Sequence, residues 1–258
     1  MHIPRVKFDP QNIDLGPDMD GRMRNPSPIE NPWLKLPSDA PYVLEIDRKC
    51  IERYNEKKRS RARKIDTSLI PEPFIGNPRS AKLVLLNLNP GLAEDDAEAH
   101  TRPDLKAAMF LNLRHESQQY PFYPLNPQFE KTPCAKWWLR ITGRLIQGLD
   151  VACVAEKLLV IEWFPYHSQE SGLPKDRRVC ESQQYSCQLV QEMRARGAFM
   201  VLLRSQENWA ICDKHLSKLP LPNSRENPVI SATNFGEKWF NQMRRSLSEC
   251  HERADLSG

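Results

Sequence analysis

The residues best suited to do chemistry follow an uninterrupted aliphatic run. Leu83–Leu86 leads directly into Asn87, and Asn89 stands two residues further on, before Pro90 and Gly91. Proline and glycine end a strand in a turn. Because ligands bind at the carboxyl ends of strands in open α/β sheets, both amides are expected in a ligand crevice. An amide there can position a water molecule, although it cannot act as an effective general base.

A second aliphatic run also ends in polar and aromatic residues. Leu158–Ile161 is followed by Glu162 and then by the turn Trp163-Phe-Pro-Tyr-His-Ser168. Phe164 or Tyr166 offers an aromatic face for stacking on a planar ligand. His167 can donate a proton or a hydrogen bond. We expect these residues beside the same crevice, although a strand-end carboxylate and a lone histidine also occur as structural residues.

Four strands are predicted to carry these residues. They are Lys82–Leu88, Lys157–Trp163, Phe199–Leu203 and Asn227–Ser231. Runs of aliphatic residues are typical of strands buried on both faces. Helical patterns separate most of them, which predicts an α/β fold: a three-layer sandwich around a central, mostly parallel four-stranded sheet.

The helices are predicted from apolar residues at helical spacing. Thr132-Pro133 marks a helix start, with Trp137, Trp138, Ile141, Leu145 and Leu149 as its buried stripe. Two further helices are predicted over Asp104–Leu113 and Val179–Gly197. Another helix contains Trp209, Cys212 and Leu216, and the last contains Trp239, Phe240, Met243 and Leu247. Tryptophans at this spacing indicate core packing.

The chain is expected to begin with an irregular arm over residues 1–37, followed by one α/β domain over residues 38–258. A basic helix (38–66) would open that domain, capped by Ser38 or Asp39 and packed through Val43, Ile46, Cys50 and Tyr54. Its cations include Arg48, Lys49, Arg53, Lys57, Lys58, Arg59, Arg61, Arg63 and Lys64. They form either a phosphate-contacting surface or the solvated face of a helix.

Composition narrows the class of protein. The chain has 258 residues, a net charge of +4 and no apolar run long enough to span a bilayer, so we expect a soluble, cytoplasmic monomer without membrane contact. The charge permits binding to nucleic acid. Seven cysteines without a C-x-x-C pair predict buried free thiols. Neither a metal site nor a cofactor is expected.

The segment Asn87-Leu-Asn-Pro-Gly91 resembles the first motif of the uracil-DNA glycosylase superfamily, in its Asn-Pro-Gly branches. The order of later elements is similar over roughly residues 79–247, although the usual His-Pro-Ser motif is replaced by Ser231-Ala-Thr-Asn234. The resemblance implies a uracil-DNA glycosylase-like fold and a divergent DNA glycosylase. Such an enzyme flips a nucleotide out of the stack and hydrolyses its N-glycosidic bond to leave an abasic site.

The resemblance also implies roles for particular residues. Asn89 would position the attacking water, and Asn234 or His167 would donate to the departing base. Asn87, Glu162, Phe164 and Tyr166 would contact the base, with Phe122 or Tyr123 stacking on it and Phe110 as a competitor. Phosphate contacts would come from Lys57, Lys58, Arg59, Arg61, Arg225 and Lys238, although surface charge explains them equally.

The side chain of Glu162 indicates which base the enzyme would accept. A carboxylate accepts hydrogen bonds, which suits the exocyclic amino group of a cytosine-like or modified base rather than uracil. We therefore expect a monofunctional glycosylase for a non-standard base, in phage defence or base-excision repair. The alternatives are a catalytically inactive nucleic-acid-binding module of the same fold, a uracil- or mismatch-specific repair glycosylase, and an α/β enzyme acting on free nucleotides.

Overall fold

The computed structural model describes residues 30–248, and these form one compact unit from Asn31 onward. Most of the expected arm, residues 1–29, lies outside the described residues. Its last part forms a short 3₁₀ helix, η1 (Pro32–Lys35), which buries Trp33 in the core. Within the described range, no helix combines the length and apolarity needed to cross a membrane.

A central four-stranded mixed sheet organises the fold. Strands β2 (Leu83–Asn87), β3 (Leu158–Glu162) and β4 (Phe199–Leu202) are parallel, whereas β1 (Phe74–Ile75) pairs antiparallel with β3. Their order across the sheet is β1-β3-β2-β4. The α/β class and the central four-stranded sheet are therefore confirmed.

The predicted fourth strand, Asn227–Ser231, is wrong. This segment carries no strand assignment, because its backbone bonds are made elsewhere: Val229 donates to the Asn227 carbonyl, and Ile230 donates to the Ile141 carbonyl. Pro228 also lacks the N–H that a strand ladder needs. The fourth place in the sheet belongs to β1, a two-residue strand between Pro73 and Gly76.

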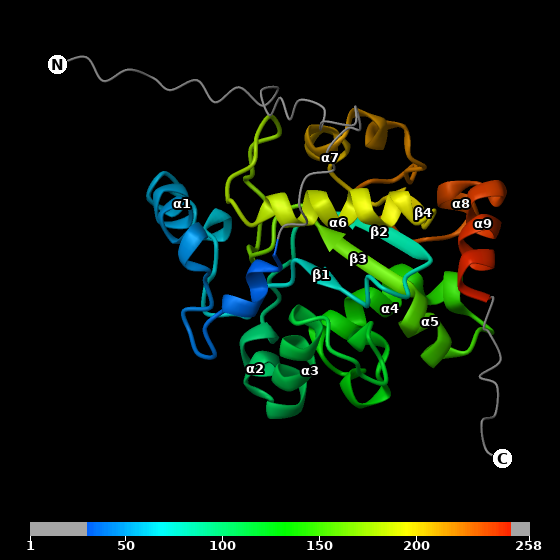
Figure 1. Cartoon of the computed structure of the whole chain (residues 1–258), viewed down its shortest axis with the longest axis horizontal. Coiled ribbons are helices and arrows are strands. Elements are labelled where there is room, and N and C mark those ends of the chain that lie inside the picture. Colours follow the sequence, from blue (N-terminus) through cyan, green and yellow to red (C-terminus); the bar gives the residue numbers. More distant parts are fainter. Residues whose placement is uncertain (1–29, 249–258) are drawn as a thin grey trace, which may run out of the picture. The chain divides into compact units, whose positions relative to one another are not determined.

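Helices cover both faces of the sheet (Figure 1). Helix α6 (Gln183–Ala195) lies on one face, while α4 (Pro133–Ile146) and α5 (Val151–Lys157) lie on the other. The aliphatic residues of β2 and β3 are consequently almost fully buried. The other helices are α1 (Glu45–Glu56), α2 (Asp96–Thr101), α3 (Pro103–Leu113), α7 (Gln206–Cys212), α8 (Ala232–Phe235) and α9 (Glu237–Ser248), with 3₁₀ turns η2 (Arg61–Arg63), η3 (Tyr123–Leu125), η4 (Pro127–Phe129) and η5 (Lys214–Lys218).

Helix α4 begins where the sequence predicts. The Thr132 hydroxyl accepts a hydrogen bond from the Ala135 amide, and Pro133 occupies the first turn. A proline there costs nothing, because the amide it lacks would have no partner inside the helix. Of the two tryptophans in the expected buried stripe, Trp138 is buried and Trp137 is half-buried. The side chain of Trp137 is therefore partly exposed and does not belong wholly to the core.

The predicted basic helix (38–66) is shorter than expected; of its predicted packing residues, Val43, Cys50 and Tyr54 contact the core, whereas Ile46 does not. Helix α1 starts after Leu44, so neither Ser38 nor Asp39 caps it. Its buried residues are Asp47 and Ile51, whereas Ile46 is 47% exposed. Asp47 is tolerated because the Tyr166 hydroxyl and the Ser182 amide donate to it. The basic residues beyond Glu56 lie on an irregular segment that includes η2.

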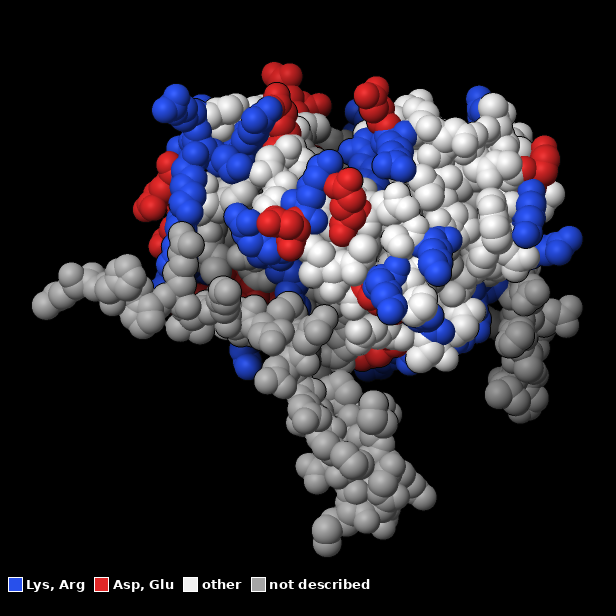
Figure 2. All heavy atoms as spheres, turned by 90° about the horizontal axis from the view of Figure 1, so that it is seen from above, with Lys and Arg blue, Asp and Glu red and all other residues white. Residues whose placement is uncertain are grey.

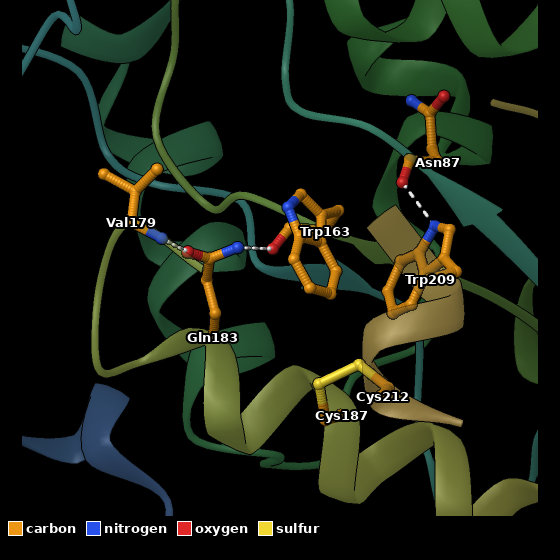
Figure 3. Close-up of a disulfide and its surroundings, with 7 residues drawn as sticks. All are labelled: Asn87, Trp163, Val179, Gln183, Cys187, Trp209 and Cys212. Atoms are coloured by element: carbon orange, nitrogen blue, oxygen red, sulfur yellow. Dashed lines mark hydrogen bonds between the residues drawn. A yellow bond between two sulfur atoms is a disulfide. The ribbon is translucent and has the colours of Figure 1, made fainter. Parts of the chain in front are cut away.

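Two helices anchor the ends of β2 and β3 (Figure 3). A disulfide joins Cys187 of α6 to Cys212 of α7, so the prediction of free thiols is wrong for this pair. Trp209 of α7 donates from Nε1 to the Asn87 carbonyl at 2.9 Å, and Gln183 of α6 donates to the Trp163 carbonyl at 2.9 Å. Cys50, Cys134 and Cys180 are free.

Candidate functional site

A cavity of about 410 Å³ lies at the carboxyl ends of the parallel strands. We call it the strand-end cleft. Its lining brings together four residues that the sequence places in a crevice, namely Asn87, Asn89, Glu162 and His167. The volume falls within the range of small-molecule pockets, roughly 300–1,000 Å³. The position agrees with the rule that open α/β sheets bind ligands beyond their strand ends.

Asn89 is fixed at the wall of the strand-end cleft. Its side-chain amide nitrogen donates to the Pro90 carbonyl at 2.8 Å and to the Ser168 hydroxyl at 3.0 Å. Both bonds use Nδ2, which leaves Oδ1 as an acceptor without a partner among the described residues. An anchored carbonyl oxygen of this kind can hold a water molecule in one orientation.

Asn87 and Glu162 form a buried pair inside the cleft. They occupy matched positions of β2 and β3, and Asn87 Nδ2 donates to Glu162 Oε1 at 3.0 Å. Burial raises the pKa of Glu162 to about 8, despite the opposing effect of the Asn87 hydrogen bond. The carboxyl is thus mainly neutral at pH 7, in contrast to the carboxylate expected from the sequence.

Three polar atoms at the cleft are buried and lack a hydrogen-bond partner in the described structure. They are Asn87 Oδ1, Glu162 Oε2 and Arg204 Nε. Buried polar groups are normally paired, so a cluster of unpaired ones in a cavity indicates a place for a ligand. Their order along the sheet edge is Glu162, Asn87, Arg204, because these residues end β3, end β2 and follow β4.

His167 lines the cleft but is held on both ring nitrogens. Nδ1 lies 2.7 Å from the Gly91 carbonyl oxygen, and Nε2 lies 2.9 Å from the Ile70 carbonyl oxygen. To donate to a ligand, the ring would have to give up one of these contacts. Its neighbour His100 accepts from the Ile70 amide, and burial lowers the pKa of His100 to about 3. His167 therefore has a structural role: it joins the segment that contains Gly91 to the segment that contains Ile70.

Two acidic residues of the cleft, Glu72 and Asp96, were not among the predicted site residues. Glu72 stands between Pro71 and Pro73, and its Oε1 accepts from the Tyr123 hydroxyl and from Cys134 Sγ. Burial raises the pKa of Glu72 and also that of Asp96, which accepts from the Ala93 amide. Glu72 stands in no recognisable motif, so no local signal could have identified it.

Trp137 and Arg204 also line the cleft and were not among the predicted site residues. The Trp137 ring centroid lies 4.3 Å from the Arg140 guanidinium carbon and 5.4 Å from that of Arg204. These are cation–π distances. Arg204 could have been identified, since it directly follows the predicted strand Phe199–Leu203 and strand ends form the site.

Several expected base-contacting residues are core residues instead. Phe122 and Tyr123 are buried: Phe122 packs edge-on against Trp138, while the Tyr123 hydroxyl bonds to Glu72. Phe164 and Tyr166 are fully buried against each other. None of the four lines the strand-end cleft, so their predicted role in stacking is wrong. Their apolar rings complete the packing beneath it.

Asn234 is turned away from the cleft. Its Nδ2 donates to the Val229 carbonyl at 2.9 Å, and its Oδ1 accepts from the Ser224 amide at 2.9 Å. These bonds close the loop before α8, and Asn234 is not part of the cleft lining. Its predicted role as a donor to the leaving base is therefore wrong.

The predicted phosphate-contacting cations do not gather at the cleft. Arg225 bonds to Gln206 at 3.3 Å, and the Lys238 ammonium lies 4.4 Å from the Trp239 ring centroid. Arg59 precedes η2 and Arg61 begins it, and both are exposed, whereas Lys57 and Lys58 line a different cavity. Among the lysines and arginines of residues 30–248, Arg204 is the one that lines the cleft.

Among residues 30–248, no cluster of three or more His, Cys, Asp or Glu side chains is arranged to hold a metal ion. Comparison with known proteins identified no matching family model, curated protein or solved structure.

Proposed function

We propose that this protein is a monofunctional DNA glycosylase that hydrolyses the N-glycosidic bond of a flipped-out pyrimidine. The observation that carries the proposal is the set of three unpaired buried polar atoms on Glu162, Asn87 and Arg204 in a cavity that also holds Asn89. A flipped base is recognised by hydrogen bonds to its Watson–Crick edge and by apolar walls. Trp137 and Trp138 provide such a wall.

The hydrogen-bonding pattern favours one pyrimidine edge. A neutral Glu162 donates from Oε2, Asn87 accepts at Oδ1, and Arg204 donates from Nε. In that order, donor, acceptor and donor match O4, N3–H and O2 of a uracil-type base. The expectation of a cytosine-like base depended on an ionised Glu162. A neutral Glu162 does not support that expectation. An ionised Glu162 would instead accept from an exocyclic amino group.

The proposed reaction uses the anchored amide of Asn89. Its free Oδ1 orients a water molecule toward the anomeric carbon, while the sugar acquires oxocarbenium character and the base departs with the electrons of the N-glycosidic bond. The water oxygen then bonds to the anomeric carbon, and the proton that it releases neutralises the departed base anion. The neutral carboxyl of Glu162 and the guanidinium of Arg204 stabilise negative charge on the departing base, because donors in a buried site need no reorganisation. This assigns to Glu162 and Arg204 the role that the resemblance gave to Asn234 or His167.

An oligonucleotide assay tests this proposal. Purified protein would be incubated with single strands and duplexes carrying uracil, mismatches, cytosine or modified cytosines, and abasic sites would be detected by alkaline cleavage. Asn89→Ala should reduce abasic-site formation about 100-fold with unchanged oligonucleotide affinity. Asn241→Ala, on the exposed face of α9, is the matched control and should retain full activity.

The second candidate function is a nucleic-acid-binding module without catalysis. It is favoured by His167, whose two ring nitrogens are both occupied, and by Asn234, which lies outside the cleft. Salt-sensitive binding to every oligonucleotide without base release would support the module and contradict the glycosylase. Base release from free nucleosides with weak DNA binding would instead indicate an enzyme that acts on free nucleotides.

A further inference from the structure

A second cavity, of about 290 Å³, lies between α1 and the segment that precedes α6. We call it the basic cavity. Its charged lining residues are all cationic: Arg53, Lys57, Lys58, Arg177 and Arg178. Figure 2 shows Lys and Arg side chains spread over this face of the molecule, including the side that carries α1, with Asp and Glu side chains among them. Convergent cations in a hollow favour an anionic ligand.

Lys58 is held in place within the basic cavity. Its ammonium donates to the Gly172 carbonyl at 2.9 Å and lies 4.4 Å from the Tyr54 ring centroid. A Cβ at position 172 would come within 3.1 Å of both Lys58 Nζ and the Tyr54 hydroxyl. Glycine therefore lets the loop approach closely enough to fix the lysine, which reduces the entropy lost when an anion binds.

Other cations of the basic cavity remain free to bind. Arg53, Lys57 and Arg178 form no ion pair with any described residue, while Arg177 pairs with Asp176 at 3.2 Å. Arg53 and Arg178 are exposed at the rim. Guanidinium groups bind phosphate oxygens through paired N–H donors, and lysine adds a compact charge. Phosphate is the anion that this combination suits best.

One loop forms a wall of both cavities. Gln169 and Ser171 line the strand-end cleft, whereas Gly172 and Pro174 line the basic cavity. Consecutive residues advance by at most about 3.6 Å, so the two cavities are neighbours along this loop. A nucleic acid strand with one nucleotide in the cleft would carry its adjoining phosphates past the loop.

We propose that the basic cavity binds backbone phosphates of a nucleic acid strand, next to the nucleotide held in the strand-end cleft. The position relative to that nucleotide rests on the proposed function, but phosphate binding itself does not. The site combines Arg53 of α1 and the two lysines that follow this helix with cations from the loop before α6, which the sequence separates by more than a hundred residues.

Fluorescence anisotropy with a labelled single strand of about 16 nucleotides tests the site. The double variant Arg53→Gln/Arg178→Gln removes two exposed charges, and we expect about tenfold weaker binding and a salt-dependence slope reduced by about 1 to 2. Lys214→Gln/Lys218→Gln removes the same charge from exposed positions of η5 and should leave both quantities unchanged.

Two outcomes would overturn the proposal. Equal weakening by both double variants would mean that net charge alone attracts the strand. If tripolyphosphate binds the wild-type protein but not Arg53→Gln/Arg178→Gln, while the oligonucleotide affinity is unchanged, the cavity serves a small phosphate compound instead. Loss of oligonucleotide binding in the Arg53/Arg178 variant, from a protein that releases no base, would support this site and contradict only the glycosylase.

Discussion

Asn87 Nδ2 donates a 3.0 Å hydrogen bond to Glu162 Oε1, between the last residues of two neighbouring parallel strands. The bond occupies one polar atom of each side chain and leaves the other, Asn87 Oδ1 and Glu162 Oε2, buried and unpaired. The pair therefore presents a fixed hydrogen-bonding edge to the cleft. The protonation state of Glu162 decides whether its Oε2 donates a hydrogen bond to a ligand or accepts one.

Uracil excision should fall as pH rises above about 8. The pKa of Glu162 is raised to about 8 by burial, so deprotonation above that pH removes the proposed donor to the departing base. The rate should drop about tenfold per pH unit in alkali. Glu162→Gln keeps a donor at this position and should flatten the profile. An unchanged alkaline fall in that variant would assign the titration to another group.

Excision of a cytosine-like base should show the opposite dependence. Ionised Glu162 accepts a hydrogen bond from an exocyclic amino group, so the rate should rise with pH near 8. Single-turnover rates on matched uracil and modified-cytosine oligonucleotides compare the two bases. Equal pH profiles for both would show that Glu162 does not read the base.

The same carboxyl should make the fold less stable as pH increases. Its pKa rises from an ordinary value of 4.5 to about 8 on folding, so the unfolded chain loses the proton first. Between these values the free energy of unfolding should fall by about 1.4 kcal/mol per pH unit. Urea titrations should show a shallower fall for Glu162→Gln. Identical slopes would mean that Glu162 is ionised in the folded protein.

Thr132→Ala should lower the free energy of unfolding by about 1 to 2 kcal/mol. The hydroxyl accepts from the Ala135 amide at 3.3 Å and donates to the Phe129 carbonyl at 2.8 Å, and alanine makes neither bond. Urea denaturation measures the effect. Thr233→Ala, at an exposed position of α8, serves as the control and should change stability by less than about 0.5 kcal/mol.

Reduction of the Cys187–Cys212 disulfide should also destabilise the protein. The two cysteines are 25 residues apart, and a loop of that length corresponds to about 3 kcal/mol. Cys187→Ser/Cys212→Ser removes this bond alone and should lose about 3 kcal/mol without reductant, whereas Cys50→Ser should not. A urea midpoint indifferent to reductant would contradict the bond. A chain kept in a reducing cytosol would carry two thiols at these positions.

The parts of the fold that the sequence predicts are those with an unbroken pattern. Continuous aliphatic runs identify β2, β3 and β4, and a Thr-Pro start identifies α4. The strand Phe74–Ile75 has only two residues, which is too short for any periodicity to be visible. Helix α1 misleads because its buried face contains Asp47, a residue that hydrophobic spacing assigns to solvent. The disulfide depends on the packing of α6 against α7, which cysteine spacing does not reveal.

The residues of the candidate site also fall into those that a sequence pattern predicts and those that it does not. Asn87, Asn89, Glu162 and His167 meet because parallel strands bring their carboxyl ends to one edge, and this follows from the strand pattern alone. Tyr166 and Asn234 fail as predictions because a side chain's direction depends on its tertiary hydrogen bonds, here to Asp47 and to Val229. Glu72 enters the cleft through a loop between prolines, which no periodic pattern describes.

The contact between Trp209 and Asn87 has a consequence for how this protein could be altered. Trp209 bonds to the main-chain carbonyl of Asn87, while the side chain of Asn87 points away from the indole (Figure 3). Since every amino acid supplies that carbonyl, the anchor does not depend on which residue occupies position 87. Substitutions at position 87 therefore keep the Trp209 anchor, but a residue without a side-chain donor leaves the buried Glu162 Oε1 unpaired. Replacements that still donate to Glu162 are accordingly the starting point for changing the ligand preference of the cleft.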